Sequence, residues 1–175
     1  MDGIFLYIWY MILQKADYND ISLIQEIARK SWQATYQDIL SKDQMDYMLE
    51  NMYSYNEISA HLKNPNYHYF LIIDEISNSA EGFVGFENHY EDETTKLHRI
   101  YLTPESRGKG FGKMALQFLK QQIEEAGDKR IILNVNKENS ARQFYESQGF
   151  KVYGEGVFDI GNGYVMDDYL MEFTL

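Results

Sequence analysis

A run of alternating glycines constrains this chain more than any other feature. The run Arg107-Gly108-Lys109-Gly110-Phe111-Gly112 lies between a strand-like stretch that ends at Leu102 and a helix-like stretch that begins at Phe111. Because glycine lacks a Cβ atom, several backbone N–H groups in such a run can point at one ligand. The helix that follows adds the positive end of its dipole and its unpaired N–H groups. The run therefore indicates an anion site, although a flexible surface turn has the same composition and stays open.

Two nucleotide-binding motifs of similar composition do not fit. A Walker A loop needs glycine where Arg107 stands and Ser or Thr where Met114 stands. The dinucleotide motif G-x-G-x-x-G needs a glycine at Lys113. What remains is a pyrophosphate-binding loop of another kind.

The composition favours a single compact domain over residues 1–175, since 45% of the residues are hydrophobic and 15% are aromatic. The chain has no cysteine, which excludes disulfides, thiolate metal sites and a cysteine nucleophile together. A net charge of −11 argues against a nucleic-acid partner, whose binding needs a basic face. Cationic small molecules or basic peptides are better-matched partners, although an acidic surface also serves solubility alone.

The start of the chain carries an apolar run from Ile4 to Leu13. This run is too short to span a bilayer, and Asp2 stands where a signal peptide has basic residues. We therefore expect no membrane segment and a cytoplasmic protein. Residues 1–10 can be an N-terminal extension, part of a first strand, or the product of a start codon upstream of Met11, and the sequence leaves these three open.

The spacing of apolar residues predicts the order of helices and strands. Period-two and β-branched runs predict strands at residues 10–15, 68–73, 83–90, 96–102, 131–135, 150–158 and 165–173. Helical spacing predicts helices over residues 21–32, 45–52, 57–62, 111–123 and 141–145. A helix between two strands makes them parallel, so the expected α/β (α+β) architecture is a mixed sheet with antiparallel arms and a central βαβ unit. The glycine run then lies at the carboxyl end of a central strand, where open α/β sheets bind ligands.

Two motifs flank this βαβ unit and carry a family resemblance. The first is Arg99-Ile100-Tyr101-Leu102-Thr103-Pro104, directly before the glycine run, and the second is Asn139-x-x-Arg142-x-Phe144-Tyr145-x-x-x-Gly149-Phe150. Together they resemble the GNAT superfamily of acyl-CoA N-acyltransferases, over most of the chain from Tyr10 onward. The loop matches the family pattern Q/R-x-x-G-x-G/A. The resemblance implies a mostly antiparallel sheet of about six or seven strands with helices on both faces.

The resemblance also implies acetyl-CoA as co-substrate and a set of residues that bind it. Backbone N–H groups of the loop would bind its pyrophosphate, with the residues Arg107, Gly108, Lys109, Gly110, Phe111 and Gly112. Backbone groups of Ile100, Tyr101 and Leu102 would bind its pantetheine arm. Lys109 and Lys113 can add positive charge, and Asn139 would contact the cofactor, although capping the following helix explains it equally well.

Two side chains are candidates for proton transfer. In the family the tyrosine that matches Tyr145 protonates the departing thiolate, and a phenol with a pKa of about 10 is a competent acid for that step. A buried core tyrosine is the alternative. His98 is the first candidate for the base, because its usual pKa is about 6.5 and strand alternation predicts it on the face of Ile100 and Leu102. A structural histidine is as good an explanation, Lys96 is normally protonated, and the weaker candidates are Glu26, Tyr36 and Glu87.

The implied reaction is direct attack of an amine on the thioester in a ternary complex, with no metal. By family analogy the first two helices and their connection form the acceptor wall, with Trp32, Tyr36 and Asp38. Several acids can attract a polycation, although solvation of loop acids explains them better: Glu91, Asp92, Glu93, Asp167 and Asp168. The pattern is most similar to bacterial spermidine/spermine and ribosomal-protein N-terminal acetyltransferases. The acceptor is thus a polyamine or other small amine, or a peptide N-terminus. A non-catalytic acyl-CoA-binding module and a homodimer also stay open.

Overall fold

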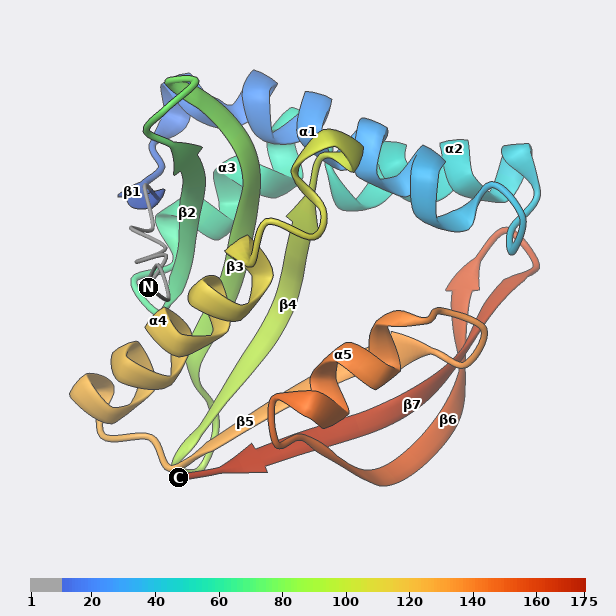
Figure 1. Cartoon of the computed structure of the whole chain (residues 1–175). Helices are drawn as coiled ribbons and strands as arrows, with labels where there is room; N and C mark the ends of the chain where they lie inside the picture. Colours follow the sequence, from blue (N-terminus) through green and yellow to red (C-terminus); the bar gives the residue numbers. More distant parts are fainter. Residues whose placement is uncertain (1–10) are drawn as a thin grey trace, which may run out of the picture.

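The computed structural model describes residues 11–175, which form one sheet in the strand order β1-β2-β3-β4-β5-β7-β6 (Figure 1). The strands are β1 (Met11–Lys15), β2 (Tyr67–Asp74), β3 (Ser79–Glu91), β4 (Thr94–Leu102), β5 (Arg130–Asn136), β6 (Lys151–Gly161) and β7 (Tyr164–Thr174). The helices are α1 (Ile21–Tyr36), α2 (Lys42–Met52), α3 (Tyr55–Lys63), α4 (Phe111–Ala126) and α5 (Ala141–Ser147), with short 3₁₀ turns η1 (Tyr18–Asp20) and η2 (Pro104–Ser106). The predicted mixed sheet is confirmed, and the expectations for residues 1–10 lie outside the described residues.

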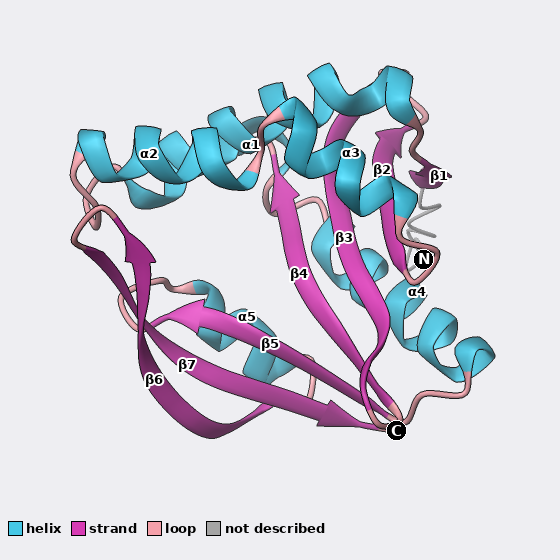
Figure 2. Cartoon of the chain, turned by 180° about the vertical axis from the view of Figure 1, so that it is seen from behind, coloured by secondary structure: helices cyan, strands magenta, loops and turns pink. Residues whose placement is uncertain are grey.

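The sheet divides where its parallel pair of strands separates. β4 and β5 run parallel but pair only at their first residues, of which Lys96 and Ile132 are the last. Beyond this point the two strands diverge, as both views show (Figures 1 and 2). All the other neighbouring strands pair antiparallel. The βαβ unit predicted around α4 is therefore present, and its two strands form a V that opens at their carboxyl ends.

An apolar core lies on each face of the sheet, and a smaller third cluster lies under α4. One contains Ile24, Trp32 and Tyr69 and is covered by α1, α2 and α3. The other contains Leu119 and Met171 and is covered by α4 and α5. α3 and α4 accordingly exchange front and back between the two views (Figures 1 and 2). The V therefore opens onto a different helix layer on each side.

The helix ends follow from local sequence signals. Ser41 Oγ accepts a hydrogen bond from the N–H of Gln44 at 3.2 Å, which is one half of a capping box at the start of α2. The reciprocal half of the capping box is missing, because the Gln44 side chain donates to the Val165 carbonyl instead. Gly127 ends α4 with φ 85°, a left-handed conformation that glycine adopts without strain. None of the helices in residues 11–175 is long and apolar enough to cross a membrane.

The tip of the β6–β7 hairpin lies against α2. Tyr47 donates a hydrogen bond from its hydroxyl to the Ile160 carbonyl at 3.2 Å, and its ring lies 5.5 Å from that of Tyr164. α1 and α2 thus pass across the open end of the V from one arm to the other (Figure 1).

Candidate active site

A cleft of about 780 Å³ occupies the V between β4 and β5. Its walls come from both strands, from the loop before α4, from the end of α1 and from the start of α5. Because pairing between the two strands stops at Lys96 and Ile132, the remaining residues of each strand turn an unpaired backbone edge toward the cleft. An extended amide-containing ligand can bind such an edge as an added strand does.

The glycine loop forms one end of this cleft. Gly108 and Gly110 have φ values of 80° and 84°, which side chains rarely tolerate. The first hydrogen bond of α4 runs from the N–H of Met114 to the Gly110 carbonyl, so earlier N–H groups in the first turn lack helical acceptors. Gly112 packs closely, since a Cβ atom there would lie 3.2 Å from Cζ of Phe144. The arrangement fits a diphosphate bound by backbone N–H groups.

The charged side chains of the loop point in different directions. Arg107 donates to Thr35 Oγ1 at 2.8 Å, which ties the loop to the end of α1. Lys113 lines the cleft, as do Arg107 and four other loop residues, Gly108, Gly110, Phe111 and Gly112. Lys109 does not, because its Nζ lies 3.5 Å from Asp74 on the far side of the loop. The expectation that the Lys109 side chain adds charge in the cleft has no support in this geometry.

Tyr145 lies on α5 with its ring between Phe144 and Phe150 and lines the cleft. The residue is 8% exposed. Burial, and then the neighbouring Tyr36, raise the pKa of Tyr145 above its usual value. The phenol is therefore protonated at neutral pH and can donate its proton to a ligand.

Asn139 joins α5 to α1 across the cleft. Its Oδ1 accepts from the N–H of Ala141 at 2.9 Å, which stabilises the start of α5 as the sequence predicts. Its Nδ2 donates to the Tyr36 hydroxyl at 3.2 Å. Burial raises the pKa of Tyr36 to about 12, and this hydrogen bond partly opposes the shift. Both residues line the cleft, so Asn139 has a structural role beside any contact with a ligand.

Trp32 does not lie where the sequence analysis places it. The residue is 2% exposed and packs behind Tyr36, with 4.8 Å between the two ring centroids. It is absent from the cleft lining, and its indole N–H has no partner among the described residues. Helical spacing makes Trp32 a core residue of α1, whereas Tyr36, one turn later, and Asp38 line the cleft.

The strand β4 contains a bulge at His98. Two neighbours on β3, Gly85 and Phe86, pair with β4. Their partners are Arg99 and Leu97, so His98 between them has no partner on β3. A bulge of this kind breaks the alternation of side chains along a strand.

Because of this bulge, the prediction that His98 shares a face with Ile100 and Leu102 is wrong. Its ring stacks on Tyr67 at 5.0 Å, and Tyr67 belongs to the core under α1–α3. Ile100 and Leu102 pack toward the opposite side, against the core under α4. His98 still lines the cleft, but from the side of α1.

His98 is a neutral ring in this setting. Glu87 Oε2 lies 3.2 Å from its Nε2 and by itself would favour protonation. Burial outweighs this contact and, with the nearby charge of Arg99, lowers the pKa of His98 to about 3. A neutral imidazole can accept a proton, and Glu87 is placed to receive it next.

The sequence analysis missed Asn134 as a cleft residue. Asn134 lies on β5 and lines the cleft opposite β4. A signal was available, since a polar residue interrupts the apolar run Ile131-Ile132-Leu133 there. Thr35 also lines the cleft, and no sequence pattern marks it.

Comparison with known proteins agrees with this geometry. The model of the Acetyltransferase (GNAT) family matches residues 23–150. The Spermidine N(1)-acetyltransferase of Thermoplasma acidophilum is 30% identical over 146 residues, which cover 80% of this chain and 88% of that protein. The [Ribosomal protein bS18]-alanine N-acetyltransferase of Haemophilus influenzae is 37% identical over 91 residues, which cover 51% of this chain and 60% of that protein.

Solved structures show the same fold. The PaiA N-acetyltransferase from Thermoplasma acidophilum, solved in complex with coenzyme A, matches with a TM-score of 0.80 and 24% identity, over 94% of this chain and 99% of that one. A mutant of the spermidine N-acetyltransferase SpeG from Vibrio cholerae matches with a TM-score of 0.68 and 21% identity, over 94% of each chain.

Proposed function

The chain belongs to the GNAT family of acetyltransferases, and we propose that it transfers an acetyl group from acetyl-CoA directly to a primary amine. One observation carries the proposal: a glycine loop, two open strand edges and the phenol of Tyr145 border a single cleft. The cleft opens toward α4 and α5 on one side and toward α1 on the other. Two substrates can therefore reach the same point from opposite faces of the sheet.

The loop and the strand edges provide the donor site. Backbone N–H groups around Gly110 and the N-terminus of α4 bind the diphosphate, and Lys113 adds a positive charge at the cleft. The unpaired edge of β4 from Ile100 to Leu102 accepts and donates hydrogen bonds to the amides of the pantetheine arm. This directs the thioester into the V, toward Tyr145.

The chemistry needs one acid and one base. The amine nitrogen attacks the thioester carbonyl, the carbon–sulfur bond breaks, and Tyr145 gives its proton to the departing sulfur. The proton lost by the amine passes to His98 and from there to Glu87, 3.2 Å away. A pKa of about 3 makes His98 a weak base, so in this proposal the ring passes the proton to Glu87 instead of holding it.

A polyamine or other small amine is the favoured acceptor. The relative with 30% identity over most of the chain is a spermidine acetyltransferase, and the net charge of −11 favours cationic substrates. Acetylation of a protein N-terminus is the second candidate, since the bS18-alanine relative matches over 91 residues. A binding module without turnover is the third, and the retained Tyr145 argues against it. The proposal places the enzyme in the bacterial cytoplasm and leaves a homodimer open.

A thiol-release assay separates these three functions. The protein is incubated with acetyl-CoA and, in turn, with diamines and polyamines, monoamines, amino acids and peptides with a free N-terminus. We expect release of free thiol that depends on a small amine. Release with peptides alone would favour the N-terminal enzyme. Tight acetyl-CoA binding with no acceptor-dependent release across the whole panel would favour the binding module.

A further inference from the structure

Two neighbouring acids on β7 have opposite environments. Asp167 is exposed, and its Oδ1 lies 2.8 Å from Lys137 Nζ. Asp168 is 7% exposed. Side chains alternate along a strand, and Met166, two residues before Asp168, packs into the core under α1–α3. Asp168 therefore faces the side of the sheet on which α1 and His98 lie.

Asp168 is a buried carboxylate without a cation. Its Oδ2 accepts only a long hydrogen bond of 3.5 Å from Asn134 Nδ2, and its Oδ1 is buried with no partner among the described residues. Burial raises the pKa of Asp168, as expected where solvent is removed and no countercharge replaces it. Buried charges in proteins are normally paired, so this carboxylate has an unfilled place for a positive group.

Three neighbours place Asp168 beside the cleft. Asn134, its hydrogen-bond donor, lines the cleft from β5. The negative charge of Asp168 contributes to raising the pKa of Tyr36, which lines the cleft from α1. The charge of Lys96 on β4 in turn lowers the pKa of Asp168. The carboxylate therefore lies at the acceptor side of the cleft, on the arm opposite His98.

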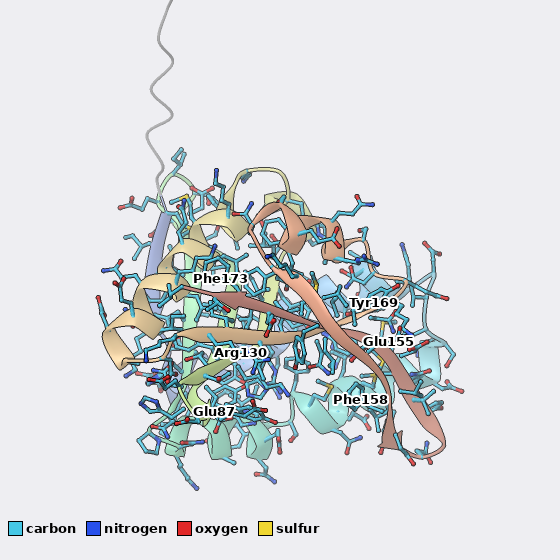
Figure 3. The ribbon with its side chains drawn as sticks, turned by 90° about the horizontal axis from the view of Figure 1, so that it is seen from below. Glu87, Arg130, Glu155, Phe158, Tyr169 and Phe173 are labelled. Carbon is cyan, nitrogen blue, oxygen red and sulfur yellow. The ribbon has the colours of Figure 1, made fainter. Side chains whose placement is uncertain are left out.

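An apolar surface lies next to this carboxylate. Gly156 on β6 pairs with Asp168, and as a glycine it places no side chain beside the carboxylate. The ring of Phe158 covers the space, since a Cβ atom at Gly156 would lie 3.0 Å from its Cζ. Figure 3 shows Phe158 on the β6–β7 arm and Glu87 on the other arm. An aliphatic chain can pack against the ring while its charged end reaches the carboxylate.

We propose that Asp168, oriented by Asn134, binds the second ammonium group of a diamine or polyamine whose first amine is acetylated. The inference rests on the proposed function and adds to it a specificity residue and a substrate class. Asp168 selects acceptors that carry two amines on a flexible apolar chain. A monoamine or a peptide N-terminus leaves this carboxylate unpaired.

Calorimetric titration with 1,4-diaminobutane and 1-aminobutane tests this site. Asp168→Asn keeps the shape and removes the charge, and Asp167→Asn is the matched control on the adjacent residue. We expect Asp168→Asn to weaken diamine binding by about tenfold or more, as loss of a charge-assisted contact does, and to leave monoamine binding unchanged. Asp167→Asn should leave both unchanged. Equal losses in the two variants, or no loss in Asp168→Asn, would overturn the proposal.

Turnover of 1-aminobutane separates this proposal from the proposed function. Thiol release with the monoamine in wild type and Asp168→Asn shows that acetyl transfer does not depend on the subsite. If thiol is released but the preference for the diamine over the monoamine in kcat/KM is the same in both proteins, the subsite is wrong and the function stands. If Asp168→Asn weakens diamine binding but no amine releases thiol, the subsite stands and the function is wrong.

Discussion

The two sides of the cleft differ in the groups that they offer to a ligand: one offers backbone groups and the other side chains. The proposed donor side consists mainly of backbone: glycine N–H groups, the first turn of α4 and the open edges of β4 and β5. The proposed acceptor side consists of side chains: Tyr36, His98 and Asn134 line the cleft, and Asp168 lies beside Asn134. A site made of backbone groups tolerates few substitutions, because it depends on the conformations that glycine adopts. A site made of side chains can change its ligand specificity with each substitution. The difference explains how one fold can keep its donor and vary its acceptor.

Tyr145 lies where the two sides meet, and its replacement should have the largest effect. Tyr145→Phe removes the acid that protonates the thiolate, so kcat should fall on the order of 10²-fold while the KM for acetyl-CoA barely moves. Tyr36→Phe is the matched control, because it removes a cleft hydroxyl that Asn139 already engages. Steady-state kinetics with a good amine acceptor measure both. An unchanged kcat in Tyr145→Phe would remove the phenol from the chemistry.

The backbone nature of the donor side can be tested with two glycines of one helix. Gly110 and Gly127 flank α4 with φ values of 84° and 85°. Alanine at either position costs about 1–2 kcal/mol of stability through the left-handed conformation. Only Gly110→Ala should raise the KM for acetyl-CoA, by about 100-fold if two charge-assisted hydrogen bonds are lost.

Equal KM values for acetyl-CoA in Gly110→Ala and Gly127→Ala would contradict the assignment of the loop. Thermal unfolding of the two variants provides the check that both remain folded and lose similar stability.

The buried histidines His61 and His98 should make the stability of the protein depend on pH. Burial and Arg99 lower the pKa of His61 to about 4 and of His98 to about 3, against about 6.5 in the unfolded chain. Below pH of about 6.5 the unfolded state takes up protons that the folded state refuses, so stability falls as the pH drops toward 4. His98→Asn should flatten this fall in the melting temperature. The same slope in variant and wild type would mean that His98 titrates normally.

The smallest expected effect concerns Asp168 and is a gain in stability. Removing a buried carboxylate that lacks a cation should raise the melting temperature of Asp168→Asn at pH 7 by about 2–4 °C. Asp167→Asn breaks an exposed ion pair with Lys137, so it should leave the melting temperature nearly unchanged or lower it. A lower melting temperature in Asp168→Asn would show that the carboxylate has a stabilising partner within the protein. Asp168 would then not be an unpaired group on the acceptor side.

The sequence predicts the fold around the glycine loop well because glycine spacing and helix signals are local. The order of helices and strands along the chain, the βαβ unit and the place of the loop follow from such signals. The acceptor side depends on long-range geometry that no local pattern records. A bulge turns His98 to the other face, Trp32 packs behind Tyr36, and alternation separates Asp167 from Asp168.

Initial rates with both substrates varied test the central claim most directly. If donor and acceptor occupy opposite sides of one cleft at the same time, acetyl transfer passes through a ternary complex. Double-reciprocal plots for acetyl-CoA and 1,4-diaminobutane should then intersect, with acetylated diamine and free thiol formed in equal amounts. Parallel lines would indicate an acetylated enzyme intermediate, with the amine binding only after free coenzyme A has left. That result would contradict the account.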